Sequence, residues 1–163
     1  FVRGYHKTHN FPILISNCTN NYGPFQHNEK LIPNVLNSLI KAEKIPIYGD
    51  GKNIRDWLFV GDHCDAIELV FKNGTIGETY NIGGGYEISN IDLAKLLIKI
   101  FDEINLNPVG FSEKLIHFVD DRAGHDFRYA INHNKITKQL GWKPKTNFQH
   151  GIIETVKWYL KKL

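Results

Sequence analysis

Two arginines, far apart in the sequence, are the residues best suited to chemistry on a charged ligand. Arg55 stands inside an apolar stretch next to Asp56, and Arg122 stands in an acidic segment. A charged side chain in an apolar strand is costly to bury unless it is paired or meets a ligand. A guanidinium makes two parallel charge-assisted hydrogen bonds to phosphate oxygens, which a lysine ammonium cannot match. The two arginines therefore predict a diphosphate site, although an internal ion pair with Asp56 explains Arg55 equally well.

Other segments also place polar or aromatic side chains beside the ends of predicted strands. Asn20 and Asn21 follow one strand, Asn81 stands near the end of another, and His125 lies in the second arginine's segment. Loops at strand ends are where α/β proteins usually bind ligands. Tyr48 adds an aromatic face suited to a base or a sugar. These residues are candidates for one binding site, although turn formation also explains the asparagines taken singly.

The motifs for hydride and metal chemistry are absent from the sequence. No strand–GxxGxxG–helix unit is present to bind a dinucleotide, and no Tyr-x-x-x-Lys pair lies on a predicted helix with a partner Ser or Thr. The glycines at 83–85 favour a plain turn over a phosphate cradle, and His63 near a helix start favours a structural role. The acidic segment at 120–126 lacks a recognised metal-ligand spacing. We therefore expect no catalytic residue, no metal and no redox chemistry from this chain alone.

The elements that must position these side chains are short strands and amphipathic helices in alternation. Apolar residues at i, i+3 and i+4 spacing, with capping residues and turn signals, predict helices at 1–10, 29–43, 61–72, 90–103, 132–141 and from 147 to the end. Buried-strand patterns lie at 12–19, 45–48, 54–60, 77–85, 116–119 and 129–131, and 20–28 is predicted to be a loop. The fold class is therefore mixed α/β, with strands too short for a whole doubly wound sheet.

The composition suits one globular domain, since the 163 residues are 42% hydrophobic with a net charge of +3. Scattered lysines give no nucleic-acid surface, and no apolar run reaches the roughly 20 residues of a membrane span. Cys18 and Cys64 show no metal-ligand spacing, which favours buried thiols over a disulfide and a cytoplasmic location. Because the sequence lacks methionine and opens inside a predicted helix, we expect a fragment of a longer protein.

Six motifs, in this order and spacing, resemble one family of nucleotide-sugar enzymes. They are NCTNNYGP, EKLIP, PIYGDGKNIRDWLFVGDH, GETYNIGGG, DRAGHDFRYAI and LGWKP. The chain resembles, along its whole length, the C-terminal part of the dTDP-glucose 4,6-dehydratases, which belong to the extended short-chain dehydrogenase/reductase family. The resemblance implies an α/β fold of mixed short strands and helices, with the NAD-binding Rossmann half largely missing. It also implies a single nucleotide-sugar-binding domain over residues 1–163, in which residues 1–20 are a remnant of the Rossmann half.

The resemblance implies an activity for the longer parent. Enzymes of this family are lyases of deoxysugar biosynthesis. Bound NAD oxidises the sugar at carbon 4, water is eliminated across carbons 5 and 6, and the hydride returns to carbon 6. Their glycine-rich loop, acid/base carboxylates and Tyr-x-x-x-Lys pair match positions upstream of Phe1. We therefore expect a homodimeric parent that uses NAD and dTDP-glucose, and a fragment that is inactive and retains no NAD.

By resemblance, the substrate-binding residues are Asn20, Lys30, Leu31, Pro46, Tyr48, Arg55, Asn81, Asp121, Arg122 and His125. Asn20 resembles the asparagine that contacts the substrate, and Asn21 the one that approaches the nicotinamide end of NAD. Pro46 and Tyr48 match contacts to the base and ribose region. The two arginines resemble the diphosphate ligands, which agrees with the inference from their chemistry.

The sequence departs from the family pattern at a few positions and leaves two other functions open. Ala123 stands where proline is usual, Gly61 replaces an acidic residue, and Asn132-His133 replace an aspartate and its follower. None of these changes removes a proposed ligand. The alternatives are a stand-alone nucleotide-sugar-binding module without catalysis, and a related nucleotide-sugar epimerase or decarboxylase.

Overall fold

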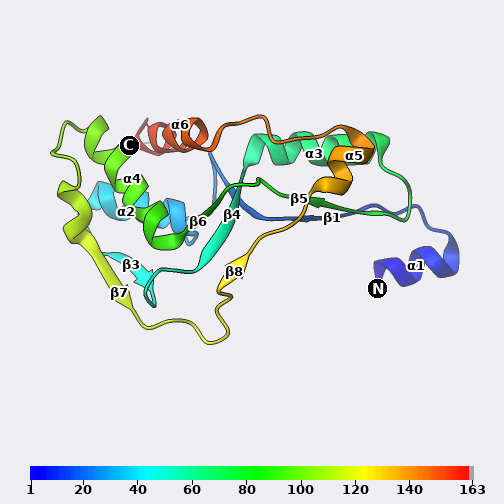
Figure 1. The fold of residues 1–163 in the computed structure, drawn as a ribbon, viewed down its shortest axis with the longest axis horizontal. Helices are drawn as coiled ribbons and strands as arrows, with labels where there is room; N and C mark the ends of the chain where they lie inside the picture. Colours follow the sequence, from blue (N-terminus) through cyan, green and yellow to red (C-terminus); the bar gives the residue numbers. More distant parts are fainter. Residues whose placement is uncertain (162–163) are drawn as a thin grey trace.

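In the computed structural model, which describes residues 1–161, the molecule is elongated and its helices gather toward the two ends (Figure 1). Strand β4 (Ile54–Phe59) runs through the middle and connects them. It pairs in parallel with β2 (Asn20–Tyr22) and β8 (Arg128–Tyr129), and antiparallel with β6 (Glu87–Ser89). Because side chains alternate along a strand, neighbouring residues of β4 serve the two ends of the molecule: Trp57 belongs to one hydrophobic cluster and Leu58 to another.

The larger cluster lies where three helices pack together, namely α2 (Leu31–Lys41), α4 (Asn90–Ile104) and α6 (Phe148–Lys161). The apolar residues of α4 recur at helical spacing, so Leu93, Leu97 and Ile98 are fully buried against α2 and α6. Ser89 caps α4 by accepting a hydrogen bond from the backbone N–H of Asp92 at 3.2 Å. The parallel pair β3 (Ile45–Tyr48) and β7 (Ile116–Val119) closes this end (Figure 1).

The smaller cluster lies under α3 (Val60–Asn73) and α5 (Asn134–Leu140), on the parallel pair β1 (Ile15–Cys18) and β5 (Thr79–Ile82). Tyr80 and Ile82 of β5 are fully buried there, with Ala66 and Val70 of α3. Helix α1 (Val2–His9) lies beyond it at the N-terminal end of the molecule (Figure 1) and has no buried residue, so its predicted apolar side is not covered.

The predicted fold class is confirmed, and the structure corrects several details. Residues 20–22 form strand β2 rather than a loop. Strand β6 and a 3-10 helix, η1 (Phe111–Leu115), are absent from the prediction. Helices α2 and α5 begin at Leu31 and Asn134, two residues after their predicted starts. The end of the last predicted helix, residues 162–163, lies outside the described residues.

Two further expectations concern cysteines and membranes. Both cysteines are free thiols, but Cys18 is only half-buried and Cys64 is exposed, so the prediction of buried thiols is wrong for Cys64. Across residues 1–161, every helix is too short or too polar to cross a bilayer.

Candidate functional site

A cavity of about 570 Å³ lies where the ends of β1 and β2, the start of α2 and strands β3, β4 and β8 meet the 120–127 segment. Most of the predicted ligand residues line it: Asn20, Asn21, Lys30, Leu31, Pro46, Tyr48, Arg55, Arg122 and His125. Two predicted residues, Asn81 and Asp121, are outside its lining. Segments more than one hundred positions apart in the sequence therefore converge on one hollow.

Arg55 is held at the wall of this cavity by two backbone carbonyls. Its guanidinium donates to the oxygen of Ile54 and to the oxygen of Asp126, each at 2.8 Å. Only 9% of the residue is exposed, and this burial lowers the pKa of the guanidinium. The contact with Asp126 ties the 120–127 segment to β4, so Arg55 both supplies a charge and fixes the loop that carries Arg122.

Arg122 lines the same cavity as Arg55 and lies beside the aromatic ring of Tyr48. Its guanidinium carbon is 5.4 Å from the centroid of that ring, within the range of a cation–π contact. A smaller cavity of about 410 Å³ adjoins the first and shares four of its lining residues, Arg55, Arg122, His125 and Tyr129. Both arginines therefore line both cavities. Two guanidiniums at one site suit an anion with two phosphates, because each can bond two phosphate oxygens.

Asp56 does not pair with Arg55. Within residues 1–161 neither side chain takes the other as an ion-pair partner, because neighbours on a strand point to opposite faces. The Asp56 carboxylate instead accepts a hydrogen bond from the backbone N–H of Tyr86 at 3.0 Å. It is 1% exposed, and burial raises the pKa of its carboxyl group.

Asp56→Asn is expected to change how stability depends on pH. Because the folded-state pKa of Asp56 is raised, the folded protein holds this proton more readily than the unfolded chain does. The cost of the charged form is fully present above the raised pKa and is relieved as pH falls through it. In urea denaturation, the stability of the variant relative to the wild type should therefore be more favourable at neutral than at acidic pH. An identical difference at both pH values would contradict this account.

Asn20 and Asn21 form one end of the cavity because β2 pairs with the second half of β4. The side chain of Asn21 is already engaged within the protein. Its amide donates to the oxygen of Thr19 at 3.0 Å, and its carbonyl accepts from Nδ1 of His63 at 2.8 Å. Burial lowers the pKa of His63, which favours the neutral ring. The structural role predicted for His63 is therefore to fix the amide of Asn21 at the cavity wall.

The two predicted residues outside the lining have protein partners of their own. Asn81 lies on β5, where its carbonyl oxygen accepts from Nδ2 of Asn17 at 3.1 Å, so the structure does not bring it to this cavity. Asp121 accepts from Nδ1 of His125 at 2.6 Å and from the backbone N–H of Arg122 at 2.8 Å. The hydrogen bond from His125 is the largest cause that holds the pKa of Asp121 below its usual range.

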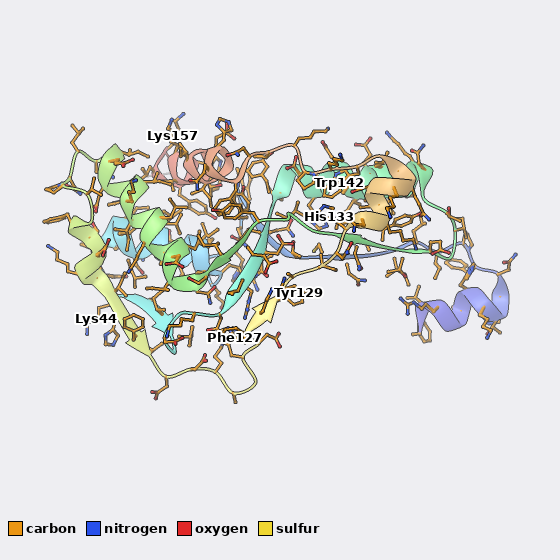
Figure 2. All side chains as sticks on the ribbon, in the orientation of Figure 1. Lys44, Phe127, Tyr129, His133, Trp142 and Lys157 are labelled. Carbon is orange, nitrogen blue, oxygen red and sulfur yellow. The ribbon has the colours of Figure 1, made fainter. Side chains whose placement is uncertain are left out.

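The structure adds lining residues that sequence reasoning missed, among them Asn90 and Tyr129. Asn90 was assigned only to the start of a helix, although a polar residue at that junction is a signal for a site. Tyr129 pairs in register with Arg55, and its hydroxyl donates to the oxygen of Cys18 at 3.3 Å. Figure 2 shows Tyr129 on β8 beside β4. Tyr129 therefore spans the cavity from the arginine wall to the strand end before Asn20.

A larger cavity, of about 720 Å³, lies between α5, the start of α6 and the loop after β5. None of the predicted ligand residues lines it. Its buried carboxylate, Asp62, is already bonded to the backbone N–H groups of Lys145 and Thr146, at 3.2 and 2.9 Å. The cavity of about 570 Å³ that contains the two arginines is thus the better candidate site for an anionic ligand.

Comparison with known proteins gives one consistent result. The family model described as GDP-mannose 4,6 dehydratase matches residues 1–155. A dTDP-glucose 4,6-dehydratase of Xanthomonas campestris pv. campestris is 48% identical over 160 residues, which cover 98% of this chain and 46% of the relative. Its counterpart in Haemophilus influenzae is 45% identical over 162 residues, covering 98% of this chain and 48% of the relative. The chain spans about half the length of the curated relatives it matches.

A solved structure supports the same assignment of the fold. The dTDP-glucose 4,6-dehydratase of Bacillus anthracis, in complex with NAD, is 43% identical with a TM-score of 0.87. The match covers 98% of this chain and 48% of that one. The predicted resemblance to the dTDP-glucose 4,6-dehydratases is therefore confirmed, as is the expectation that NAD accompanies such enzymes.

The residues of this chain do not by themselves fit a dinucleotide. Within residues 1–161, the glycines at 83–85 lead from β5 into strand β6 rather than into a helix. An added Cβ on Gly84 would lie 1.8 Å from the carbonyl oxygen of Trp57, so close packing explains this glycine. Asn21, the one residue predicted to approach NAD, is bonded to His63 and Thr19. We derive no step through NAD for these residues.

Proposed function

Because the chain belongs to the GDP-mannose 4,6-dehydratase family, we propose that it is the substrate-binding part of an NAD-dependent dTDP-glucose 4,6-dehydratase. The family model carries the name of an enzyme for GDP-mannose, whereas relatives at 45 to 48% identity are named for dTDP-glucose. These identities extend over nearly the whole chain. They favour dTDP-glucose as the substrate.

The observation that carries this proposal is the presence of two guanidiniums in one cavity beside an aromatic face. Arg55 and Arg122 line the same hollow, and Tyr48 lies next to Arg122. The pair suits the diphosphate of a nucleotide sugar, because each guanidinium can bond two phosphate oxygens at once. Tyr48 and Pro46 offer an apolar surface for the base and ribose, on the side of the cavity that β3 forms.

The arrangement of these residues supports one direction for the proposed ligand. With the base beside β3 and the diphosphate between the arginines, the hexose extends toward Asn20 and Asn21 at the end of β2. In the proposed parent, residues outside this chain would hold NAD, which would supply the oxidation of the sugar that precedes the loss of water. This chain then binds and orients the sugar, and residues outside it supply the hydride and proton transfers.

The proposal also covers the activity of the isolated chain, its domain organisation, and the oligomeric state and location of the parent. The isolated chain is proposed to bind the nucleotide sugar without turning it over, since its one Tyr-x-x-x-Lys spacing, Tyr48 to Lys52, lies at a strand end and turn rather than on a helix. Within the parent it forms one domain, of which residues 1–20 belong with the Rossmann half, and the parent is a homodimer. Free thiols at Cys18 and Cys64 agree with a reducing compartment, for which we propose the cytoplasm.

Titration calorimetry with the chain tests the proposal. We expect saturable binding of dTDP-glucose and dTDP, and weaker binding of GDP-mannose and UDP-glucose. The full-length protein with NAD should convert dTDP-glucose into its 4-keto-6-deoxy product, which the chain alone should not form. A well-folded chain that binds none of these nucleotides, together with a full-length protein inactive on dTDP-glucose, would refute the proposal. Activity of the full-length protein on UDP-sugars alone would favour an epimerase or decarboxylase.

A further inference from the structure

The carboxylate of Asp121 makes the shortest contact to a side chain of the candidate site, yet Asp121 does not line the cavity. Its Oδ1 lies 2.6 Å from Nδ1 of His125 and also accepts from the backbone N–H of Arg122. The imidazole side chain is only 5% exposed, and His125 lines both the main and the adjoining cavity. Asp121 is thus placed to orient the imidazole ring of His125 rather than to contact a ligand in the cavity.

We propose that Asp121 is a positioning residue that holds His125 for the diphosphate, and that binding of a nucleotide sugar requires the protonated form of His125. This inference rests on the function proposed above. It assigns Asp121 a different role from the ligand contact that the sequence predicted.

The reasoning follows from the hydrogen-bonding groups of histidine. A neutral imidazole has one N–H donor, and the contact with the Asp121 carboxylate uses it at Nδ1. The other nitrogen, Nε2, is then only an acceptor, and within residues 1–161 it has no hydrogen-bond partner in the protein. Phosphate oxygens are acceptors too, so Nε2 can bond to a diphosphate only when it carries a second proton. When Nε2 carries that proton, the Asp121 carboxylate at 2.6 Å is the opposite charge in direct contact with the ring.

The other charged and titratable groups that line the two cavities with His125 come from several elements. They are Arg122 and Asp126 on its own loop, Arg55 on β4, Tyr129 on β8, Tyr48 on β3, and Glu29 and Lys30 before α2. The two arginines and a cationic ring would carry like charges in a cavity without an anion. A diphosphate reverses that balance, since its charge attracts all three cations at once. Proton uptake and ligand binding are therefore coupled.

Calorimetry with dTDP-glucose between about pH 6 and 9 tests the coupling. In this nucleotide sugar both phosphates are esterified, so the ligand itself does not titrate in the range. We expect the affinity of the wild-type chain to fall as pH rises, with proton uptake on binding that is revealed by buffers of different ionisation enthalpy. Thymidine, which has no phosphate, should bind weakly and without this pH dependence.

Two variants and a control make the test specific. Asp121→Asn keeps an oxygen that can accept from the N–H of Arg122, but it removes the carboxylate. We expect about tenfold weaker binding at neutral pH and a fall in affinity that begins at lower pH. His125→Gln should abolish the pH dependence and the proton uptake. Asp50→Asn, which removes an exposed carboxylate paired with Lys52, should leave both unchanged.

The outcomes separate the inference from the function on which it rests. If the wild type binds dTDP-glucose and Asp121→Asn keeps its affinity, pH profile and proton uptake, the positioning role is wrong and the proposed function stands. If the wild type binds no dTDP-glucose at any pH, both fail together. Weaker binding by Asp121→Asn with an unaltered pH profile would show only that the loop was disturbed, and would also overturn the coupling.

Discussion

Arg55→Ala is expected to weaken the binding of dTDP-glucose about 100-fold. Hydrogen bonds to charged groups contribute roughly 1.5–3 kcal/mol, and about 2.7 kcal/mol corresponds to a factor of 100. We expect the loss for Arg55 to lie in the upper part of this range, because the residue is 9% exposed and its guanidinium is held by two carbonyl oxygens at 2.8 Å. The substitution also releases the contact with Asp126, so the segment that carries Arg122 loses its tie to β4. Titration calorimetry with dTDP-glucose measures the change.

The matched control is Arg128→Ala. Arg128 lies on β8 opposite Ile54, one register position from Arg55, and its guanidinium pairs with Glu87 on the exposed surface. This variant removes the same charge from the neighbouring strand without touching the cavity, and we expect binding within about threefold of the wild type. Arg55→Lys should fall between the two, because it keeps the charge and loses the planar fork. Equal affinities of the Arg55→Ala and Arg128→Ala variants would contradict a diphosphate site at Arg55.

The two arginines proposed to bind the diphosphate could be identified from the sequence because residue type alone makes them unusual at their positions. Arg55 interrupts a run that is otherwise apolar, and Arg122 lies among acidic residues at a strand end. Residue type alone identifies such positions, whatever the fold. That Arg55 also anchors the 120–127 segment was not predictable, since the bond to Asp126 joins residues 71 positions apart.

Strand alternation explains why Asn81 lies outside the lining of the cavity. On β5, Tyr80 and Ile82 point into the smaller cluster, and Asn81 therefore points the other way, toward Asn17 of β1. The sequence shows this alternation, but not which residues of each strand border the cavity with the arginines. Asn90 was missed because long-range backbone hydrogen bonds hold the start of α4 at the cavity. The N–H of Asn90 donates to the oxygen of Asn53 at 3.0 Å, and the N–H of Ile91 donates to the oxygen of Gly51 at 2.9 Å.

Strand β2 shows how pairing overrides local preference. Two asparagines in succession are poor strand formers, and the sequence alone predicts a loop there. In the structure Asn20, Asn21 and Tyr22 pair with Trp57, Leu58 and Phe59 of β4. Tyr22 is buried against the rings of Trp57, Phe59 and Phe148, which compensates for the weak strand preference of its neighbours.

Gly84→Ala is expected to cost about 3 kcal/mol of folding free energy or more, the largest effect on stability that we predict for a single methyl group. An added Cβ would lie 1.8 Å from the carbonyl oxygen of Trp57 and 2.5 Å from its carbonyl carbon. A backbone carbonyl in the centre of β4 cannot rotate away as a side chain can. The loop that contains Gly84 is also fixed two residues further along the chain, where the oxygen of Tyr86 accepts from the backbone N–H of Trp57 at 2.9 Å.

The cost arises because β4 is shared by both clusters. To admit a methyl group, the loop after β5 or the strand beneath it must shift, and Trp57 and Leu58 would leave their separate hydrophobic clusters together. Urea denaturation followed by tryptophan fluorescence measures the loss, and failure of the variant to fold agrees with it. Gly4→Ala is the control: its Cβ would meet nothing within 4 Å on exposed α1, so it should be neutral or stabilise by up to about 1 kcal/mol. If Gly84→Ala kept wild-type stability but lost dTDP-glucose binding, the glycine would belong to a phosphate cradle, and close packing would be the wrong explanation.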